Sequence, residues 1–220
     1  MDWVLNEVEI RVIGALIEKA VTTPDYYPMT LNGLTNACNQ KSNRDPVVSF
    51  TEEMVVRALD GLRDKKLAVM FSEAGGRVPK YGHEFSGFLH LSEAEEATLC
   101  VLMLRGPQTA GEVKTRCGRL HEFASPEHAE STLNGLIERG HSLAQKLPRQ
   151  PGRREPRYTQ LLGGEVEIVE AELTPAPEAA TMHVREENER LDQLAAEVET
   201  LRAEIAAMRA EFDVFRTQFE

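Results

Sequence analysis

Hydrophobic residues in the first 90 positions recur at the spacing of three amphipathic helices, and then alternate as they do in short β-strands. The helices are expected to begin just after the capping residues Asn6, Thr30 and Thr51. Strands are expected over Leu67–Phe71 and Lys80–Phe85, on either side of a turn that contains two glycines. The pattern therefore predicts three helices followed by a hairpin.

The same order returns in residues 91–162. Ser92, Thr109 and Ser125 are the expected capping residues of three further helices. Strands are expected over Leu143–Leu147 and Arg157–Leu162. The second half of the chain thus predicts another set of three helices and a hairpin.

The two halves also share residues. Leu5-Asn6-Glu7-Val8-Glu9 aligns with Leu91-Ser92-Glu93-Ala94-Glu95 at an offset of 86, and Leu59-Asp60-Gly61-Leu62 aligns with Leu133-Asn134-Gly135-Leu136 at an offset of 74. The difference of 12 residues lies between the first and third helices, where the first half has longer loops. Three helices and a hairpin form a winged helix-turn-helix domain. We predict one such domain in residues 1–90 and another in 91–162, a fold that is mainly α with small β-hairpins (α+β).

From Leu191 onward, apolar residues are separated alternately by three and four positions, which is the heptad pattern of a coiled coil. β-branched residues at a and leucine at d favour two parallel strands, in which glutamates at g face arginines at e of the second chain. We predict a C-terminal coiled-coil helix over residues 181–220 that forms a parallel homodimer. The alternative is a single amphipathic helix that folds back onto the rest of the chain. The predicted dimerisation residues are Leu191, Leu194, Val198, Leu201, Ile205, Met208, Phe212 and Phe215.

The net charge of −11 changes little in this picture, because it belongs almost entirely to the C-terminal part. Residues 163–220 hold 15 Asp/Glu against 5 Lys/Arg, so the rest of the chain is nearly neutral and its charge is no argument for or against nucleic acid. Residues 163–180 contain five of these glutamates, two prolines and no Lys or Arg, which predicts an acidic linker.

Cysteine usage and hydropathy predict a cytoplasmic protein. The three cysteines are odd in number and form no close pair, which suits reduced thiols. The N-terminus does not have the pattern of a signal peptide, and the longest apolar run, Leu99–Leu104, is too short to span a bilayer. Cys117, His121 and His128 lack a paired cysteine motif, so neither a metal nor another cofactor is predicted.

Two sets of motifs resemble a known family. The first comprises Glu18-Lys19-Ala20-Val21-Thr22-Thr23-Pro24-Asp25-Tyr26-Tyr27-Pro28 and the segment Ala37–Pro46, and the second comprises Leu104–Thr109 and Pro151–Tyr158. Together they resemble the YceH-like family of bacterial proteins, over about Leu5 to Gly163. The resemblance implies tandem winged helices in a cytoplasmic protein. It implies no activity, cofactor or catalytic residue.

The strongest concentration of positive charge falls in the second hairpin. The basic residues there are Lys146, Arg149, Arg153, Arg154 and Arg157, with Glu155 as the one acid in that segment. Arginines on a projecting hairpin suit phosphate contacts or a minor groove. The alternatives are a solvated hairpin, or one that binds the acidic linker.

Two further features bear on nucleic-acid binding. The third helices begin with acidic turns, at Glu52 and Glu127, which suits the helix dipole but repels a duplex. The loop between the second and third helices of the first domain carries Lys41 and Arg44, which rank next after the hairpin as phosphate contacts. Its alternative reading is a loop that satisfies its own hydrogen bonds, with Arg44 against Asp45.

These observations favour a non-enzymatic, dimeric protein that binds nucleic acid, DNA being the expected partner, and acts as a regulator. No phosphate loop, nucleophile elbow or metalloprotease motif is present, so no catalytic residue is predicted. The alternative function is an interaction scaffold that docks partner proteins on the winged helices and the tail.

Overall fold

The computed structural model describes residues 3–72, 78–149 and 155–164, all of which lie in one compact unit spanning Met1–Glu170. The described part combines α-helices with small antiparallel β-sheets, as the sequence predicts. The predicted coiled coil at 181–220 and nearly all of the predicted linker at 163–180 lie outside the described residues.

The first repeat contains three main helices and a three-stranded sheet. Helix α1 (Glu7–Thr22) is followed by the short 3-10 helix η1 (Pro24–Tyr26), strand β1 (Met29–Thr30) and helices α2 (Leu31–Cys38) and α3 (Glu52–Asp64). Strands β2 (Ala68–Phe71) and β3 (Lys80–His83) form the hairpin, and β1 adds to its other edge, so that the sheet order is β1-β3-β2. Helices α1, α2 and α3 pack against one another, and their apolar faces line the core.

The second repeat has the same order of elements. Helices α5 (Glu93–Arg105), α6 (Ala110–Cys117) and α7 (Pro126–Glu138) precede the hairpin strands β4 (Ala144–Lys146) and β5 (Tyr158–Gln160). In place of β1, a single antiparallel bridge joins Gln108 to Tyr158, as Met29 is joined to Tyr81 in the first repeat. In each repeat the second helix therefore follows a segment that pairs with the returning strand.

Local contacts are duplicated along with the elements. The caps of α1 and α5 are both capping boxes, made by Asn6 with Glu9 and by Ser92 with Glu95. Each of these glutamates then accepts a hydrogen bond from the C-terminal end of the third helix of its own repeat. Lys65 Nζ lies 2.6 Å from Glu9 Oε1, and Arg139 Nη1 lies 2.7 Å from Glu95 Oε1. The offsets of 86 and 74 seen in the sequence relate both partners of this ion pair.

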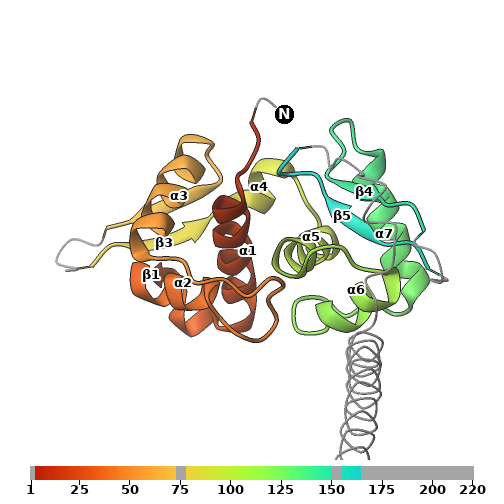
Figure 1. Cartoon of the computed structure of the whole chain (residues 1–220), viewed down its shortest axis with the longest axis horizontal. Helices are drawn as coiled ribbons and strands as arrows, with labels where there is room; N and C mark the ends of the chain where they lie inside the picture. Colours follow the sequence, from red (N-terminus) through yellow and green to blue (C-terminus); the bar gives the residue numbers. More distant parts are fainter. Residues whose placement is uncertain (1–2, 73–77, 150–154, 165–220) are drawn as a thin grey trace, which may run out of the picture. The chain divides into compact units, whose positions relative to one another are not determined.

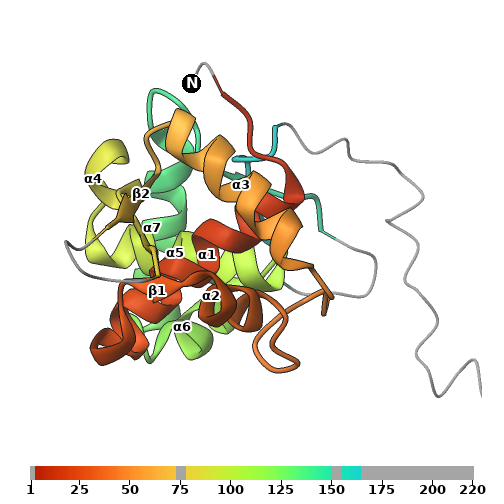
Figure 2. The ribbon, with the colours of Figure 1, turned by 90° about the vertical axis from the view of Figure 1, so that its left-hand side faces the viewer.

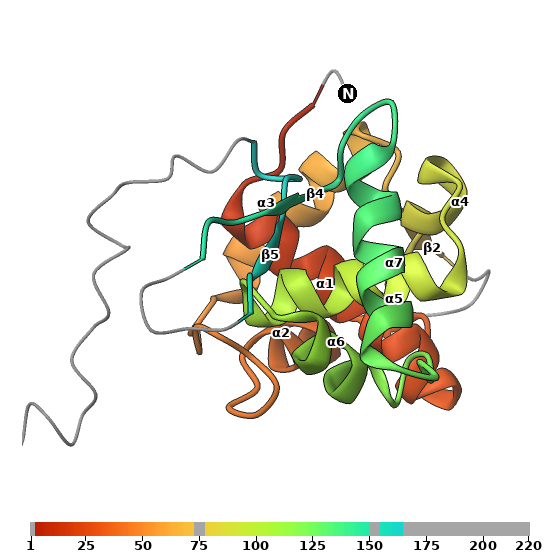
Figure 3. The same cartoon turned by 90° about the vertical axis from the view of Figure 1, so that its right-hand side faces the viewer.

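The two repeats meet along their first helices. Figure 1 shows α1 and α5 side by side at the centre, with one repeat on either side of them. Figures 2 and 3 show the outer faces, where α3 and α7 lie. At the crossing, a Cβ on Gly14 would approach Leu104 Cδ2 to 3.0 Å, and Cys100 Sγ donates a hydrogen bond to Gly14 O over 3.4 Å. Gly14 and Cys100 are 86 residues apart, so equivalent positions of the two repeats meet, and one hydrophobic core runs through both.

Two local predictions need correction. The returning strand of the first hairpin was expected to reach Phe85, but it ends at His83, and Phe85 instead begins helix α4 (Phe85–Leu89). The fully buried Phe85 ring packs into the core from this helix, and His90 ends it in a left-handed conformation with φ 51°. Strand β1 and helix η1 were not predicted, because two or three residues are too short to show a period.

Candidate binding sites: the second hairpin and the cleft between the repeats

The second hairpin holds Lys146 beside the third helix of its repeat. Lys146 Nζ lies 3.5 Å from Glu130 Oε1 on α7 and 5.4 Å from the ring centroid of Tyr158 on β5. The Tyr158 hydroxyl donates to the same Glu130 oxygen over 2.7 Å, and this hydrogen bond lowers the pKa of Glu130. The side chains of Lys146 and Glu130 remain 48% and 43% exposed, so solvent screens this pair.

The other arginines predicted for this hairpin differ in their surroundings. Arg157 donates to Glu112 Oε1 over 3.1 Å and to the carbonyl of Pro107, and so fixes the start of the returning strand to the start of α6. Arg149 is exposed and makes no ion pair with any described residue. Arg153 and Arg154 lie in 150–154, outside the described residues. The structure thus brings Lys146 and Arg157 to opposite strands and leaves Arg149 open to solvent.

The third helices present acidic surfaces, as the sequence predicts. On α3 the exposed Arg57 and Arg63 are each paired with an acid of the same helix, Glu53 at 2.5 Å and Asp60 at 3.2 Å. On α7 the exposed Glu127 follows the N-cap. Within the described residues, each exposed arginine of α3 thus has an acidic neighbour on the same helix, so the helix surface gains no net positive charge from it.

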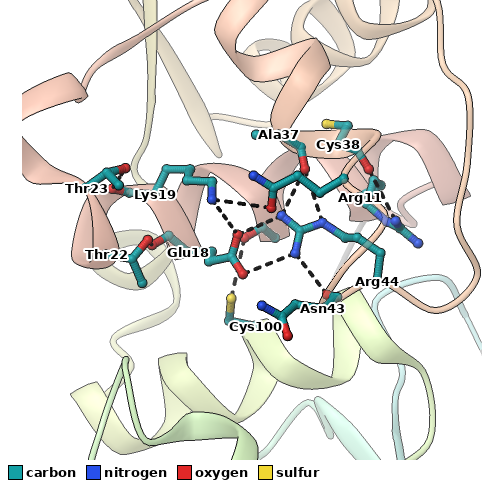
Figure 4. Close-up of polar contacts among 12 residues, drawn as sticks. Arg11, Glu18, Lys19, Thr22, Thr23, Ala37, Cys38, Asn43, Arg44 and Cys100 are labelled. Atoms are coloured by element: carbon teal, nitrogen blue, oxygen red, sulfur yellow. Dashed lines mark hydrogen bonds and ion pairs between the residues drawn. The ribbon is translucent and has the colours of Figure 1, made fainter.

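Arg44 is buried, whereas the phosphate contact predicted for it requires an exposed side chain. Its side chain is 0% exposed. It makes a two-pronged ion pair with Glu18 of α1, Nη1 to Oε1 at 3.1 Å and Nη2 to Oε2 at 2.6 Å. Its Nε and Nη2 also donate to the carbonyl of Ala37 over 3.1 and 2.9 Å, and Nη1 donates to the carbonyl of Asn43 (Figure 4). Its guanidinium is therefore used in holding the loop against α1 and α2, and the acid it pairs with is Glu18.

The carboxylate of Glu18 is ionised and engaged in ion pairs with Arg44 and Lys19. Burial opposes ionisation of the carboxyl, but the hydrogen bonds and positive charge of Arg44, with a smaller contribution from Lys19, outweigh burial and lower the pKa of Glu18. A second buried guanidinium, that of Arg11, donates to the carbonyls of Cys38 and Pro46 at the two ends of the same loop. The loop is thus held on the fold by two buried arginines.

Lys41, in contrast, lies at the rim of a cleft between the two repeats. The cleft has a volume of about 900 Å³ and is bounded by the end of α1, the loop at residues 40–43, α5 and the second half of α6. None of the hairpin residues that the structure describes, 144–149 and 155–160, lines it. Among the described residues, the lining contains one carboxylate, that of Glu18, and five basic side chains: Lys19, Lys41, Arg105, Arg116 and Arg119.

These five cations differ in how far they are paired. Arg116 donates to Gln108 and lies 3.6 Å from Glu112. Lys19 lies 3.2 Å from Glu18, and Arg105 donates to the side chain of Asn43 across the cleft.

The remaining two, Lys41 and Arg119, are exposed and have no ion-pair or hydrogen-bond partner in the part of the chain that the structure describes. The cleft therefore contains uncompensated positive charge contributed by both repeats.

Sequence reasoning found only Lys41 of these five. The others lie on three separate segments, α1, α5 and α6, and become neighbours only when the two repeats pack together. The sole local signal was the run of Lys114, Arg116 and Arg119 near the end of the short helix α6, which also suits a helix C-terminus.

The cleft and its surroundings offer no activated nucleophile among the described residues. Cys100 contributes to its wall, but burial raises the pKa of the Cys100 thiol well above its usual value. Burial also raises the pKa of Cys38 and Cys117 to about 12. Within the described ranges there is no cluster of three His, Cys, Asp or Glu residues placed to hold a metal ion. Nor is any helix there long and apolar enough to cross a membrane.

Comparisons with known proteins cover most of the chain. A family model described as "Protein of unknown function, DUF480" matches residues 5–153. A UPF0502 protein from Geotalea uraniireducens (strain Rf4) is 54% identical over 198 residues, which cover 90% of each chain. Another UPF0502 protein, from Opitutus terrae (strain DSM 11246 / JCM 15787 / PB90-1), is 56% identical over 175 residues, 79% of this chain and 76% of that protein. These matches confirm the predicted family resemblance.

Proposed function

Since the chain belongs to the DUF480 family of bacterial proteins, which its UPF0502 relatives extend over most of its length, we propose from its own residues that it is a non-enzymatic, tandem winged-helix protein that binds nucleic acid as a regulator. In this proposal residues 1–90 and 91–162 are the two winged-helix domains. The second hairpin makes the leading contacts with phosphates. The C-terminal helix joins two chains into a homodimer in the cytoplasm.

The duplicated architecture supports the winged-helix assignment. Each repeat has three helices, a hairpin after the third helix, and a short segment before the second helix that pairs with the returning strand. This is the order of elements in winged helix-turn-helix domains. The duplication of the capping boxes and of the Glu9–Lys65 and Glu95–Arg139 ion pairs supports two copies of one module.

The observation that carries the nucleic-acid proposal is the open basic charge of the second hairpin. Arg149 is exposed without an ion-pair partner in the described part of the chain, and the 3.5 Å ion pair of Lys146 with Glu130 is almost half exposed. Solvent screens such an exposed pair, so the pair contributes little to stability. Lys146 can therefore exchange Glu130 for a phosphate at little cost, while Arg157 keeps the start of the returning strand fixed on α6.

The acidic third helices set the mode of binding that we propose. A helix that reads the major groove brings its first turn close to phosphates, where the glutamates of α3 and α7 are repelled. Contacts led by the hairpin do not require α7 to enter a groove, and Lys146 of the hairpin lies beside Glu130, where its charge offsets one of the acids of α7. We therefore expect binding dominated by phosphate contacts, with strong salt dependence and weak sequence preference.

The experiment is a salt series of fluorescence-anisotropy titrations with a labelled duplex. The variants are Arg149→Ala and Arg153→Ala/Arg154→Ala, and the matched control is Arg63→Ala, which removes an exposed arginine from α3. Each lost phosphate contact is expected to lower the slope of log K against log salt by about 1 and to weaken binding uniformly across sequences. Unchanged affinity and slope in both hairpin variants would remove the hairpin from the mechanism.

A second function rests on a separate observation. The acidic surfaces of α3 and α7 suit docking to a basic partner protein, which favours the interaction scaffold. A pull-down of the full chain distinguishes the two proposals. Salt-sensitive retention on immobilised DNA supports the nucleic-acid proposal, whereas retention of proteins alone supports the scaffold.

A further inference from the structure

The cleft between the repeats has a composition that the nucleic-acid proposal does not use. We infer that it is a binding site for an organic phosphate of about the size of a nucleotide, held between the two repeats. The ligand would be a small molecule, and its site is distinct from the described part of the hairpin (residues 144–149 and 155–160), none of which lines the cleft.

The charge of the cleft favours an anion. Its lining includes five Lys or Arg side chains and one carboxylate, and the carboxylate of Glu18 already carries a two-pronged ion pair with the buried Arg44. Figure 4 shows Lys19 and Asn43 beside the Glu18–Arg44 pair. Glu18 is thus already engaged and does not neutralise the other cations of the cleft. Cations held close together without counter-charges repel one another, and a bound phosphate relieves that repulsion.

Two of these cations are available at once. Lys41 projects from the loop of the first repeat and Arg119 follows the end of α6 in the second, and neither has a partner in the described part of the chain. Arginine can present two parallel N–H groups to phosphate oxygens, and lysine adds a mobile point charge. The pair therefore supplies the donors that a phosphate group requires, from opposite sides of the cleft.

The rest of the lining favours an organic ligand over a bare inorganic ion. Val101, Leu104 and Leu120 give the cleft an apolar wall, while Gln40, Ser42 and Thr115 add neutral polar groups. A volume of about 900 Å³ lies at the upper end of the range for small-molecule sites. An inorganic phosphate would reach the cations but would leave the apolar wall in contact with water.

The loop that carries Lys41 is held in place before any ligand arrives. Hydrogen bonds from Arg44 to the carbonyl of Ala37 and from Arg11 to the carbonyls of Cys38 and Pro46 fix its two ends. The backbone N–H of Asp45 also donates to the carbonyl of Leu104 on α5 over 2.9 Å. Asn43, which receives the hydrogen bond from Arg105, has a left-handed backbone with φ 60°. A site whose side chains stand on a fixed loop loses less entropy on binding than one that must order first.

The test is isothermal titration calorimetry of the full chain with ADP, GDP, CDP and UDP, and with inorganic phosphate and adenosine. Lys41→Ala/Arg119→Ala is the test variant, and Arg57→Ala/Arg63→Ala removes the same number of charges from α3 as the matched control. Melting temperatures of both variants without ligand show that they are folded. At least one nucleoside diphosphate should bind more tightly than phosphate and adenosine. That affinity should fall about tenfold or more in the test variant and stay unchanged in the control.

Three results would overturn the inference. The first is that none of the four nucleotides binds. The second is that a nucleotide binds but the test variant keeps its affinity. The third is that Lys41→Ala/Arg119→Ala weakens the binding of an oligonucleotide but leaves nucleotide binding unchanged. That result would make the cleft part of the nucleic-acid surface. Because the hairpin variants test nucleic-acid binding at other residues, each proposal can fail without the other.

Discussion

Replacing Arg44 by methionine removes one partner of the buried ion pair with Glu18 and leaves the other in place. Methionine keeps most of the length of the side chain, so the packing of the loop changes little. Glu18, whose side chain is 13% exposed, would then keep only Lys19 at 3.2 Å as a counter-charge, and the carbonyl of Ala37 would lose both of its donors from Arg44. Breaking a buried pair in this way costs about 3–5 kcal/mol, because a buried charge is left uncompensated.

The size of this loss can be separated from a general effect of mutating the loop. Arg44→Met/Glu18→Leu removes both charges, so the double variant should be more stable than Arg44→Met even though it carries one more substitution. It should remain below wild type, because an unsatisfied carbonyl at Ala37 costs about 1–3 kcal/mol on its own. A domain of this size has a total free energy of unfolding of about 5–15 kcal/mol. The loss in the single variant is therefore large enough to measure and can approach the whole stability of the fold.

The assay is urea unfolding followed by far-ultraviolet circular dichroism on wild type, both single variants and the double variant. The free energy of unfolding and its dependence on urea are compared across the cycle. A loss of less than about 1 kcal/mol in Arg44→Met, or a double variant no more stable than the single one, would refute the structural role of the pair.

Three other outcomes are expected. The lowered pKa of Glu18 means that its contribution to stability is complete above its usual pKa of 4.5 and is lost as the pH falls through the lower folded value, so an acid titration of unfolding should lose that component in Arg44→Met. Gly135→Ala should raise the free energy of unfolding by up to about 1 kcal/mol, because its Cβ meets nothing within 4 Å, whereas Gly61→Ala should lower it, because its Cβ would collide with the buried Glu9; equal effects in urea unfolding would contradict this difference between the two third helices. Deleting residues 181–220 should convert a dimer into a monomer in sedimentation velocity, and a full chain that sediments as a monomer would exclude the predicted coiled coil.

The parts of the fold that were predicted correctly are those decided by neighbouring residues. Asn6, Thr30, Thr51, Ser92 and Ser125 were identified as N-caps because a short polar side chain precedes an apolar stripe, and each accepts the expected backbone hydrogen bond. The duplication of three helices and a hairpin followed from these caps and from the shared residues.

The parts that were missed depend on contacts between distant segments. Arg44 was predicted as a phosphate contact, with an ion pair to its neighbour Asp45 as the alternative, yet it pairs with Glu18, 26 residues earlier, because only the packing of the loop against α1 brings them together. The change from strand to helix at Phe85 is likewise a tertiary effect, since a buried ring at that point is consistent with either period. The cleft required the docking of the two repeats, for which the sequence offers no local pattern.

The position of the cleft follows from the one place where the two copies differ most. The connection from α2 to α3 contains residues 39–51, and the equivalent connection from α6 to α7 contains only residues 118–125. The extra length allows the loop of the first repeat to cross to α5, where Asp45 and Asn43 make hydrogen bonds to Leu104 and Arg105. Two identical repeats would pack symmetrically about Gly14 and Cys100, and such a symmetric arrangement would not produce a single cation-lined cleft. If this loop creates the site, shortening it to the length of its counterpart should abolish nucleotide binding in calorimetry while the duplicated Glu95–Arg139 contact in the second repeat persists.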